Sequence, residues 1–154
     1  MAHYYLDSNA LVKRYAAERG TAWIENLRDA GSGHTLYIVR VSGAEMVAAL
    51  FRRARVGSLA LSDAQAQTAQ FKADLPYDYA IVEVTESLVD TAMTLAERYG
   101  LRGYDAVQLA AALELRVALG ASGLPALTFV CADADLNTAA TAEGLPVDNP
   151  NARP

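Results

Sequence analysis

Four acidic residues fall where an enzyme of alternating strands and helices would build a site. Asp7 and Asp133 each follow a short apolar run, while Glu45 and Asp105 stand in the first turns of expected helices. Such positions converge at the carboxyl ends of parallel strands. Clustered carboxylates about 5 Å apart repel by roughly 3 kcal/mol per pair, so they must take up protons or cations. Oxygen ligands favour Mg²⁺ or Mn²⁺, and ions held this way catalyse phosphodiester hydrolysis.

Each acid also has a local explanation as a helix cap, because a carboxylate near a helix start accepts hydrogen bonds from unpaired backbone N–H groups. Asp7 could cap the first helix, Asp133 the last short one, Glu45 could complete a capping box with Ser42, and Asp105 one with Gln108. One shared site accounts for all four acids at once. For Asp105, which precedes a strongly apolar helix, we expect both roles, capping and metal binding.

The order of elements predicts the scaffold of this site. Strands are expected at 3–7, 34–39, 79–84, 126–133 and 145–148, and helices at 8–18, from Thr21, at 42–55, 62–75, 86–100, from Asp105 to about Leu119, and after residue 133. Pro76 is expected to break the chain before the third strand. Strands alternating with helices favour an α/β fold with a mostly parallel central sheet. We expect a single domain over 1–148, followed by a flexible tail at 149–154.

Composition narrows the classes of function. The chain has 154 residues, a net charge of −5, one Cys and two His, which excludes a disulfide framework and disfavours a zinc site. The negative charge argues against coating nucleic acid by bulk electrostatics, although it permits a local catalytic site. The first residues do not read as a signal peptide, and no apolar run approaches the roughly 20 residues that span a bilayer. A cytoplasmic protein without a membrane partner is therefore expected.

Four motifs in order carry a resemblance to a known family. They are "YLDSNALVKRY" at 5–15, "SGAEMVAAL" at 42–50, "GLRGYDAVQLAAAL" at 100–113 and "VCADADLNTAA" at 130–140. With this spacing the chain resembles the PIN-domain ribonucleases, and most closely the VapC-type toxins of bacterial toxin–antitoxin pairs. The resemblance implies a three-layer α/β/α sandwich and metal-dependent cleavage of single-stranded or loop RNA, leaving a 3′-hydroxyl and a 5′-phosphate.

The resemblance also implies roles for individual residues. Asp7 and Asp105 would be the main ligands of Mg²⁺ or Mn²⁺, Glu45 would bind directly or through water, and Asp133 would complete a second metal position. Ser8 and Asn9 would orient Asp7 and its water. Many relatives carry Thr or Ser where this chain has Cys131, a weaker hydrogen-bonding group. Asp135 could share or take the role given to Asp133.

Basic residues near these motifs suggest contacts with RNA phosphates. Lys13 and Arg14 could point along the cleft edge, and Arg102 precedes Asp105, whereas the run at 52–55 is interpreted as ordinary solvated surface. The resemblance further implies a homodimer and an antitoxin partner that covers the groove. The alternative is a catalytically weak PIN-like module that binds RNA or a partner without cutting.

Overall fold

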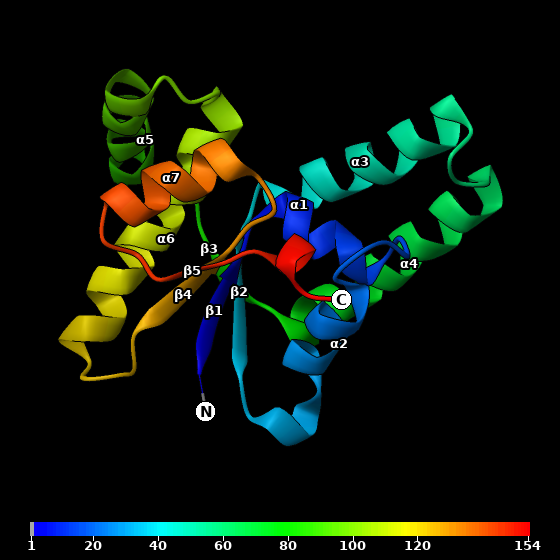
Figure 1. Cartoon of the computed structure of the whole chain (residues 1–154), viewed down its shortest axis with the longest axis horizontal. Helices are drawn as coiled ribbons and strands as arrows, with labels where there is room; N and C mark the ends of the chain where they lie inside the picture. Colours follow the sequence, from blue (N-terminus) through cyan, green and yellow to red (C-terminus); the bar gives the residue numbers. More distant parts are fainter. Residues whose placement is uncertain (1) are drawn as a thin grey trace.

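Five parallel strands form the centre of the molecule in the computed structural model, which describes residues 2–154 (Figure 1). They are β1 (His3–Leu6), β2 (Thr35–Val39), β3 (Ala80–Val82), β4 (Leu127–Val130) and β5 (Val147–Asp148). Their order across the sheet is β3-β2-β1-β4-β5, and every neighbouring pair runs parallel. The strands are short and rich in β-branched and aromatic residues, as the sequence predicted.

Helices cover both faces of the sheet (Figure 1). One layer contains α1 (Ser8–Leu11), α2 (Thr21–Arg28), α3 (Ser42–Val56) and α4 (Leu61–Asp78). The other contains α5 (Glu86–Tyr99), α6 (Gly103–Ala121) and α7 (Ala134–Ala142). Short 3₁₀ turns occur at η1 (Val12–Arg14), η2 (Ala30–Ser32) and η3 (Pro150–Ala152). The predicted three-layer α/β/α sandwich is confirmed.

Alternation along the strands divides the core into two clusters, one on each face of the sheet. Tyr5 points toward α5 and α6 and stacks on Phe129 of the neighbouring strand β4, with ring centroids 5.7 Å apart. The next residue, Leu6, points toward α1, α3 and α4. This change of face over one residue follows from the two-residue period of a strand. The step that carries Leu6 into the core leaves Asp7 at the carboxyl end of β1.

The position of β1 explains where a site can form. The chain that leaves β1 continues to β2, on one side of β1. The chain that leaves β4 continues through α7, in the second helical layer, to β5 on the other side. The connections therefore diverge at the carboxyl ends of β1 and β4. In open parallel sheets this divergence leaves a crevice that binds ligands.

Helix ends agree in part with the sequence predictions. Thr85 caps α5 through a hydrogen bond from the Leu88 N–H, and Gly57 and Gly100 end α3 and α5 with positive φ. The predicted break at Pro76 is wrong, because α4 continues to Asp78 with Pro76 inside it. A proline in the last turn removes only one backbone hydrogen bond, and the helix ends two residues later.

The first helix is shorter than predicted. In place of one helix over 8–18, α1 ends at Leu11 and continues as the tighter turn η1 to Arg14. Residues beyond β5 form η3, in which Pro150 is buried and its carbonyl oxygen lies against Gly20. In the part of the chain that the structure describes, we find no helix that combines the length and hydropathy of a membrane span.

Candidate active site

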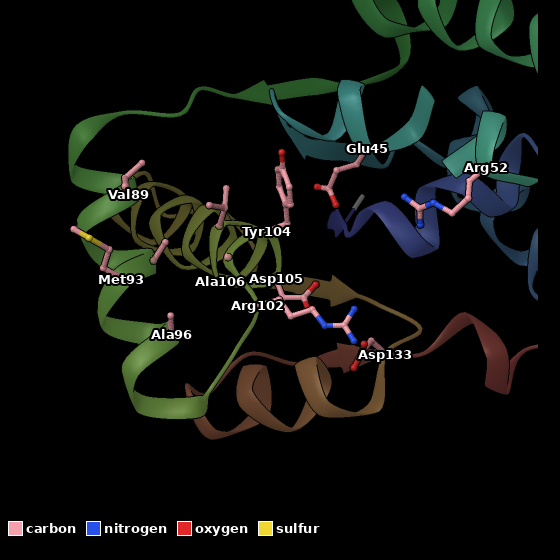
Figure 2. Close-up of a pocket in the computed structure, with 13 residues that line it drawn as sticks. Glu45, Arg52, Val89, Met93, Ala96, Arg102, Tyr104, Asp105, Ala106 and Asp133 are labelled. Carbon is pink, nitrogen blue, oxygen red and sulfur yellow. The ribbon is translucent and has the colours of Figure 1, made fainter. Parts of the chain in front are cut away.

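Two adjoining hollows at the carboxyl ends of the strands bring the four predicted acids together. Asp7, Glu45 and Asp105 line a cleft of about 620 Å³. Glu45 and Asp105 also line a neighbouring cavity of about 790 Å³, where they are joined by Asp133. Figure 2 shows Glu45, Asp105 and Asp133 directed into the same space from three different elements. The convergence expected from the sequence is therefore present.

Asp7 is the most buried of the four, with 2% of its surface exposed. It caps α1, where its Oδ2 accepts a hydrogen bond of 3.3 Å from the Asn9 N–H. Its Oδ1 is buried without a hydrogen-bond partner among the described residues. Burial raises the pKa of Asp7 to about 7, and the charges of Glu45 and Asp105 add to this effect. A buried carboxylate oxygen with no donor is well suited to a cation.

Glu45 is held by a hydrogen-bond network that the sequence did not predict. Its Oε2 accepts from Ser8 Oγ at 3.1 Å, and its Oε1 accepts from Gln108 Nε2 at 2.7 Å. The same Gln108 nitrogen donates to Ser42 Oγ, while its oxygen accepts from the Tyr5 hydroxyl at 2.6 Å. Gln108 is completely buried. It thus ties β1, α3 and α6 together behind the acids.

This network corrects two predicted capping boxes. Ser42 does not cap α3, whose N-cap is Val41, and its hydroxyl instead accepts from Gln108. Asp105 does not cap α6, because that helix begins at Gly103 with Arg102 as its N-cap. Gln108 therefore lies one turn further into the helix than a box would require. A glutamine within an otherwise apolar helix face was the signal for its buried role.

Asp105 is half-buried, and its carboxylate faces the cleft (Figure 2). Partial burial raises its pKa, as does the nearby charge of Asp133, whereas Arg102 has the opposite effect. Since Asp105 is in the first turn of the long, mostly buried helix α6, the packing of that helix fixes its position.

Asp133 and Asp135 have different surroundings. Asp133 caps α7 by accepting from the Leu136 N–H at 3.0 Å, and it lines the cavity with Glu45 and Asp105. Asp135 is exposed, as Asp133 is, but it lines a third hollow, which includes Asp105 and Asp133 but neither Asp7 nor Glu45. Of the two, Asp133 is therefore the better placed to act with the other acids.

Cys131 and Asn9 connect the two strand ends. The buried Cys131 Sγ lies 3.8 Å from Asp7 Oδ2 and accepts from the Asp133 N–H at 3.3 Å. Asn9 Oδ1 accepts from the Ala132 N–H at 2.9 Å, and its amide nitrogen contacts the Cys131 sulfur. Burial raises the pKa of the Cys131 thiol well above its ordinary range. Of the two residues expected to orient Asp7, Asn9 contacts it through its backbone N–H, while Ser8 contacts Glu45 instead.

The predicted basic residues divide into two groups. Arg102 lines the cleft, and its guanidinium extends toward Asp133 (Figure 2). Arg52, interpreted from the sequence as ordinary surface, also lines both hollows. Arg14 is not part of the cleft, because it is buried in ion pairs with Asp74 at 3.1 Å and Asp78 at 2.6 Å. Arg14 is thus a structural residue.

The side chains of the cleft can be compared with the ligands that a divalent cation requires. Among residues 2–154, no three Asp, Glu, His or Cys side chains lie close enough together to form a ready-made metal site. The cleft nevertheless offers hard oxygen ligands from three elements, and one of them, Asp7 Oδ1, is buried without a donor. These groups fit Mg²⁺ or Mn²⁺, whose charge would draw the carboxylates together.

Comparisons with known proteins agree with this architecture. The fold is similar to PAE2754 from Pyrobaculum aerophilum, with 20% identity over 95% of this chain and 89% of that one, and a TM-score of 0.61. It is also similar to VapBC2 from Rickettsia felis bound to a promoter DNA fragment, with 16% identity over 96% of this chain and 98% of that one, and a TM-score of 0.61. A third similar structure is a toxin-antitoxin complex from Klebsiella pneumoniae, with 16% identity over 97% of this chain and 98% of that one, and a TM-score of 0.62.

A search of curated proteins gave no match. By contrast, the family model described as PIN domain matches residues 4–140, a region that runs from β1 through α7 and contains all four acids. Because this match spans most of the chain, the protein belongs to the PIN domain family.

Proposed function

We propose that the protein is a metal-dependent endoribonuclease that hydrolyses RNA phosphodiester bonds, and that it acts as the toxin of a toxin–antitoxin pair. The observation that carries the proposal is the state of Asp7. Its carboxylate is buried at the carboxyl end of the central strand, with one oxygen that has no donor within residues 2–154 and with Glu45 and Asp105 lining the same cleft. A fold does not maintain such a group for stability, because an unpaired buried charge is costly.

Asp7, Glu45 and Asp105 would hold the first ion, and Asp133 would contribute to a second position. When bound, Mg²⁺ or Mn²⁺ supplies positive charge that activates the attacking water and stabilises the leaving oxygen. The protein supplies the positions. Ser8 and Gln108 fix the two oxygens of Glu45, and the Asn9 N–H fixes one oxygen of Asp7.

The residues that line the cleft favour binding of a polyanionic substrate. Arg52 and Arg102 line it together with the acids and with the exposed ring of Tyr104. Arginine binds backbone phosphates, and an exposed tyrosine can stack on an unpaired base. RNA with single-stranded or loop regions, as the family resemblance implies, is the substrate class that we propose.

The proposed partners are an antitoxin protein and a second copy of this chain, in the cytoplasm. Support for the antitoxin comes from the similar folds, two of which are described as a toxin-antitoxin complex and as VapBC2 bound to promoter DNA, whereas the homodimer is what the family resemblance implies. A measurement of molar mass at micromolar protein concentration tests the homodimer, for which we expect twice the mass of the chain. A monomeric mass would contradict it.

The alternative is a PIN-like module that binds RNA or a partner with little catalysis. Cys131 is the observation that favours it, because this weakly hydrogen-bonding thiol lies between Asp7 and Asp133. Four acids sharing one region argue for catalysis, since binding a phosphate gains nothing from clustered negative charge.

The test is cleavage of a total RNA pool containing transfer and ribosomal RNA by purified protein, with Mn²⁺ or with EDTA. We expect discrete fragments that require both Mn²⁺ and Asp105, so that Asp105→Asn is inactive. Asp135→Asn, an exposed change of the same type, is the matched control and should keep its activity. Metal binding without fragments from any RNA would favour the binding module.

A further inference from the structure

One end of the cleft holds a cluster of basic and acidic residues that the catalytic proposal does not use. Lys13, Glu18 and Arg53 all line the same cleft as Asp7, Glu45 and Asp105. Lys13 belongs to η1, Glu18 to the loop before α2, and Arg53 to the last part of α3. They are therefore brought together only by the packing of three separate segments.

The carboxylate of Glu18 bridges the two cations with one oxygen each. Its Oε1 lies 3.2 Å from Lys13 Nζ, and its Oε2 lies 3.4 Å from Arg53 Nη2. The Lys13 side chain is only 6% exposed, whereas those of Glu18 and Arg53 are each 31% exposed. The lysine is thus buried in the wall of the cleft, whereas the Glu18 carboxylate and the Arg53 guanidinium are both accessible from it.

The chemistry of this bridge matches that of an RNA backbone phosphate. A phosphodiester, like a carboxylate, carries one negative charge shared between two oxygens, and Lys and Arg are its usual protein partners. The cluster has two positive charges and one negative charge, so one positive charge remains unneutralised. Arg52, exposed on the same wall, adds to it.

The backbone around Glu18 is held by hydrogen bonds that do not involve its carboxylate. The Thr21 hydroxyl accepts from the Glu18 N–H at 3.0 Å and donates to the Lys13 carbonyl oxygen at 2.7 Å. These backbone contacts hold the segment between η1 and α2 independently of the Glu18 carboxylate.

We propose that Lys13 and Arg53 form a phosphate-binding subsite for RNA and that Glu18 occupies it, as an internal substitute for a phosphate, until RNA displaces it. This inference rests on the proposed ribonuclease function, because it assigns the path of the substrate backbone away from the acids. Glu18 then lowers RNA affinity, and its removal strengthens binding. An ordinary surface ion pair would have no such effect.

The experiment measures binding of a short fluorescein-labelled poly(U) RNA in EDTA, by fluorescence anisotropy at several salt concentrations. Glu18→Gln should bind at least about threefold more tightly at low salt, and its log–log salt slope should steepen by about 0.7, the value for one additional phosphate on single strands. Arg53→Gln and Lys13→Met should bind more weakly with shallower slopes. Thermal unfolding of each variant verifies that it is folded.

Two controls separate a specific effect from a general change in charge. Glu25→Gln, an exposed change on α2 outside the cleft lining, should leave affinity unchanged, as should Arg55→Gln on the same helix as Arg53. The double variant Glu18→Gln/Arg53→Gln should lose the gain, because the gain requires the freed arginine. A Glu18→Gln protein that binds RNA no better than Glu25→Gln overturns the inference.

Parallel cleavage assays with Mn²⁺ distinguish this failure from failure of the proposed function. If the unmodified protein cleaves RNA and Glu18→Gln does not change RNA binding, the subsite is rejected and the proposed ribonuclease stands. If Glu18→Gln binds RNA more tightly and no RNA is cleaved, the subsite stands and the proposed ribonuclease is rejected. Polyglutamate that competes as well as RNA of matched charge would assign the cluster to an acidic protein segment, which also overturns the inference.

Discussion

Asp7 meets two opposing requirements, because the position that suits it to a cation also makes it costly to the metal-free fold. Its pKa of about 7 lies above the ordinary value of 3.8, so the folded protein binds a proton more strongly than the unfolded chain does. The stability due to this proton is fully present below about pH 4 and is lost as the pH rises through about 7.

We therefore predict that Asp7→Asn raises the melting temperature of the metal-free protein at pH 8 while abolishing cleavage. The amide cannot ionise, so it avoids a cost on the order of a few kcal/mol. Calorimetry in EDTA at pH 5 and pH 8 checks this, and the gain should shrink at pH 5. Equal effects at both pH values would show that burial of the charge is not the cause.

Cys131 provides a second prediction for a single residue. Its side chain is completely buried and burial raises the pKa of its thiol, so the reactive thiolate is both rare and inaccessible. Alkylation by iodoacetamide should therefore be negligible in the folded protein and rapid in denaturant, as followed by mass spectrometry. Rapid modification of the folded protein at neutral pH would contradict this environment.

Among the elements, α6 supports the site through Gln108, which binds side chains from β1 and α3. We predict that Gln108→Leu destabilises the protein by about 1–3 kcal/mol, because it leaves buried hydroxyls without partners. It should also reduce cleavage, since Glu45 loses a donor. Urea unfolding and initial rates measure the two effects. Gln65→Leu on the exposed face of α4 is the control, and equal losses in both variants would refute the role of Gln108.

The junction of η1 and α4 gives a prediction that replaces the role expected for Arg14 in RNA binding. The Arg14 side chain is 7% exposed and contacts Asp74, Asp78 and the Tyr79 hydroxyl. Its removal leaves Asp74 partly buried without a cation and leaves Asp78 with only the exposed Arg28, which together costs on the order of 3 kcal/mol. We expect Arg14→Ala to lower the melting temperature markedly with unchanged RNA affinity. The matched change Arg28→Ala, at an exposed partner of Asp78, should cost less than about 1 kcal/mol.

These elements also show how far the sequence alone could lead. Strand order along the chain, apolar periodicity and the junction positions of the four acids predicted the layers and the cluster, because each depends on local pattern. Arg14 and Gln108 were misinterpreted because their partners lie 64 and 103 residues away. A capping signal and a buried long-range hydrogen bond use the same residue types, and only the packing of distant segments distinguishes them.

For the molecule as a whole, the proposed ligands come from both helical layers and from positions far apart in the chain. A cation held by Asp7, Glu45 and Asp105 would connect β1, α3 and α6, so its binding should stabilise the entire fold. We predict that Mn²⁺ at about 100 times its dissociation constant adds about 2.7 kcal/mol, seen as a higher melting temperature. At one fixed Mn²⁺ concentration the increase should be larger at pH 8 than at pH 6, because Asp7 must lose its proton before it binds the ion.

Asp105→Asn should reduce this increase, whereas Asp135→Asn should preserve it. A melting temperature that Mn²⁺ leaves unchanged at pH 8 would mean that the carboxylates do not hold the ion.

The central place of β1 has a consequence for synthesis. Tyr5 pairs with Phe129 of β4, and the Asp7 N–H donates to the Val130 carbonyl oxygen. The first strand to be synthesised therefore cannot complete its pairing until the fourth strand has been synthesised. On a translating ribosome, β1 lacks one of its two neighbours until more than four-fifths of the chain has been made. A nascent chain that carries Asp7 and Glu45 therefore has no complete cleft. If the chain is the ribonuclease that we propose, its catalytic cleft is therefore complete only when its own translation is nearly finished.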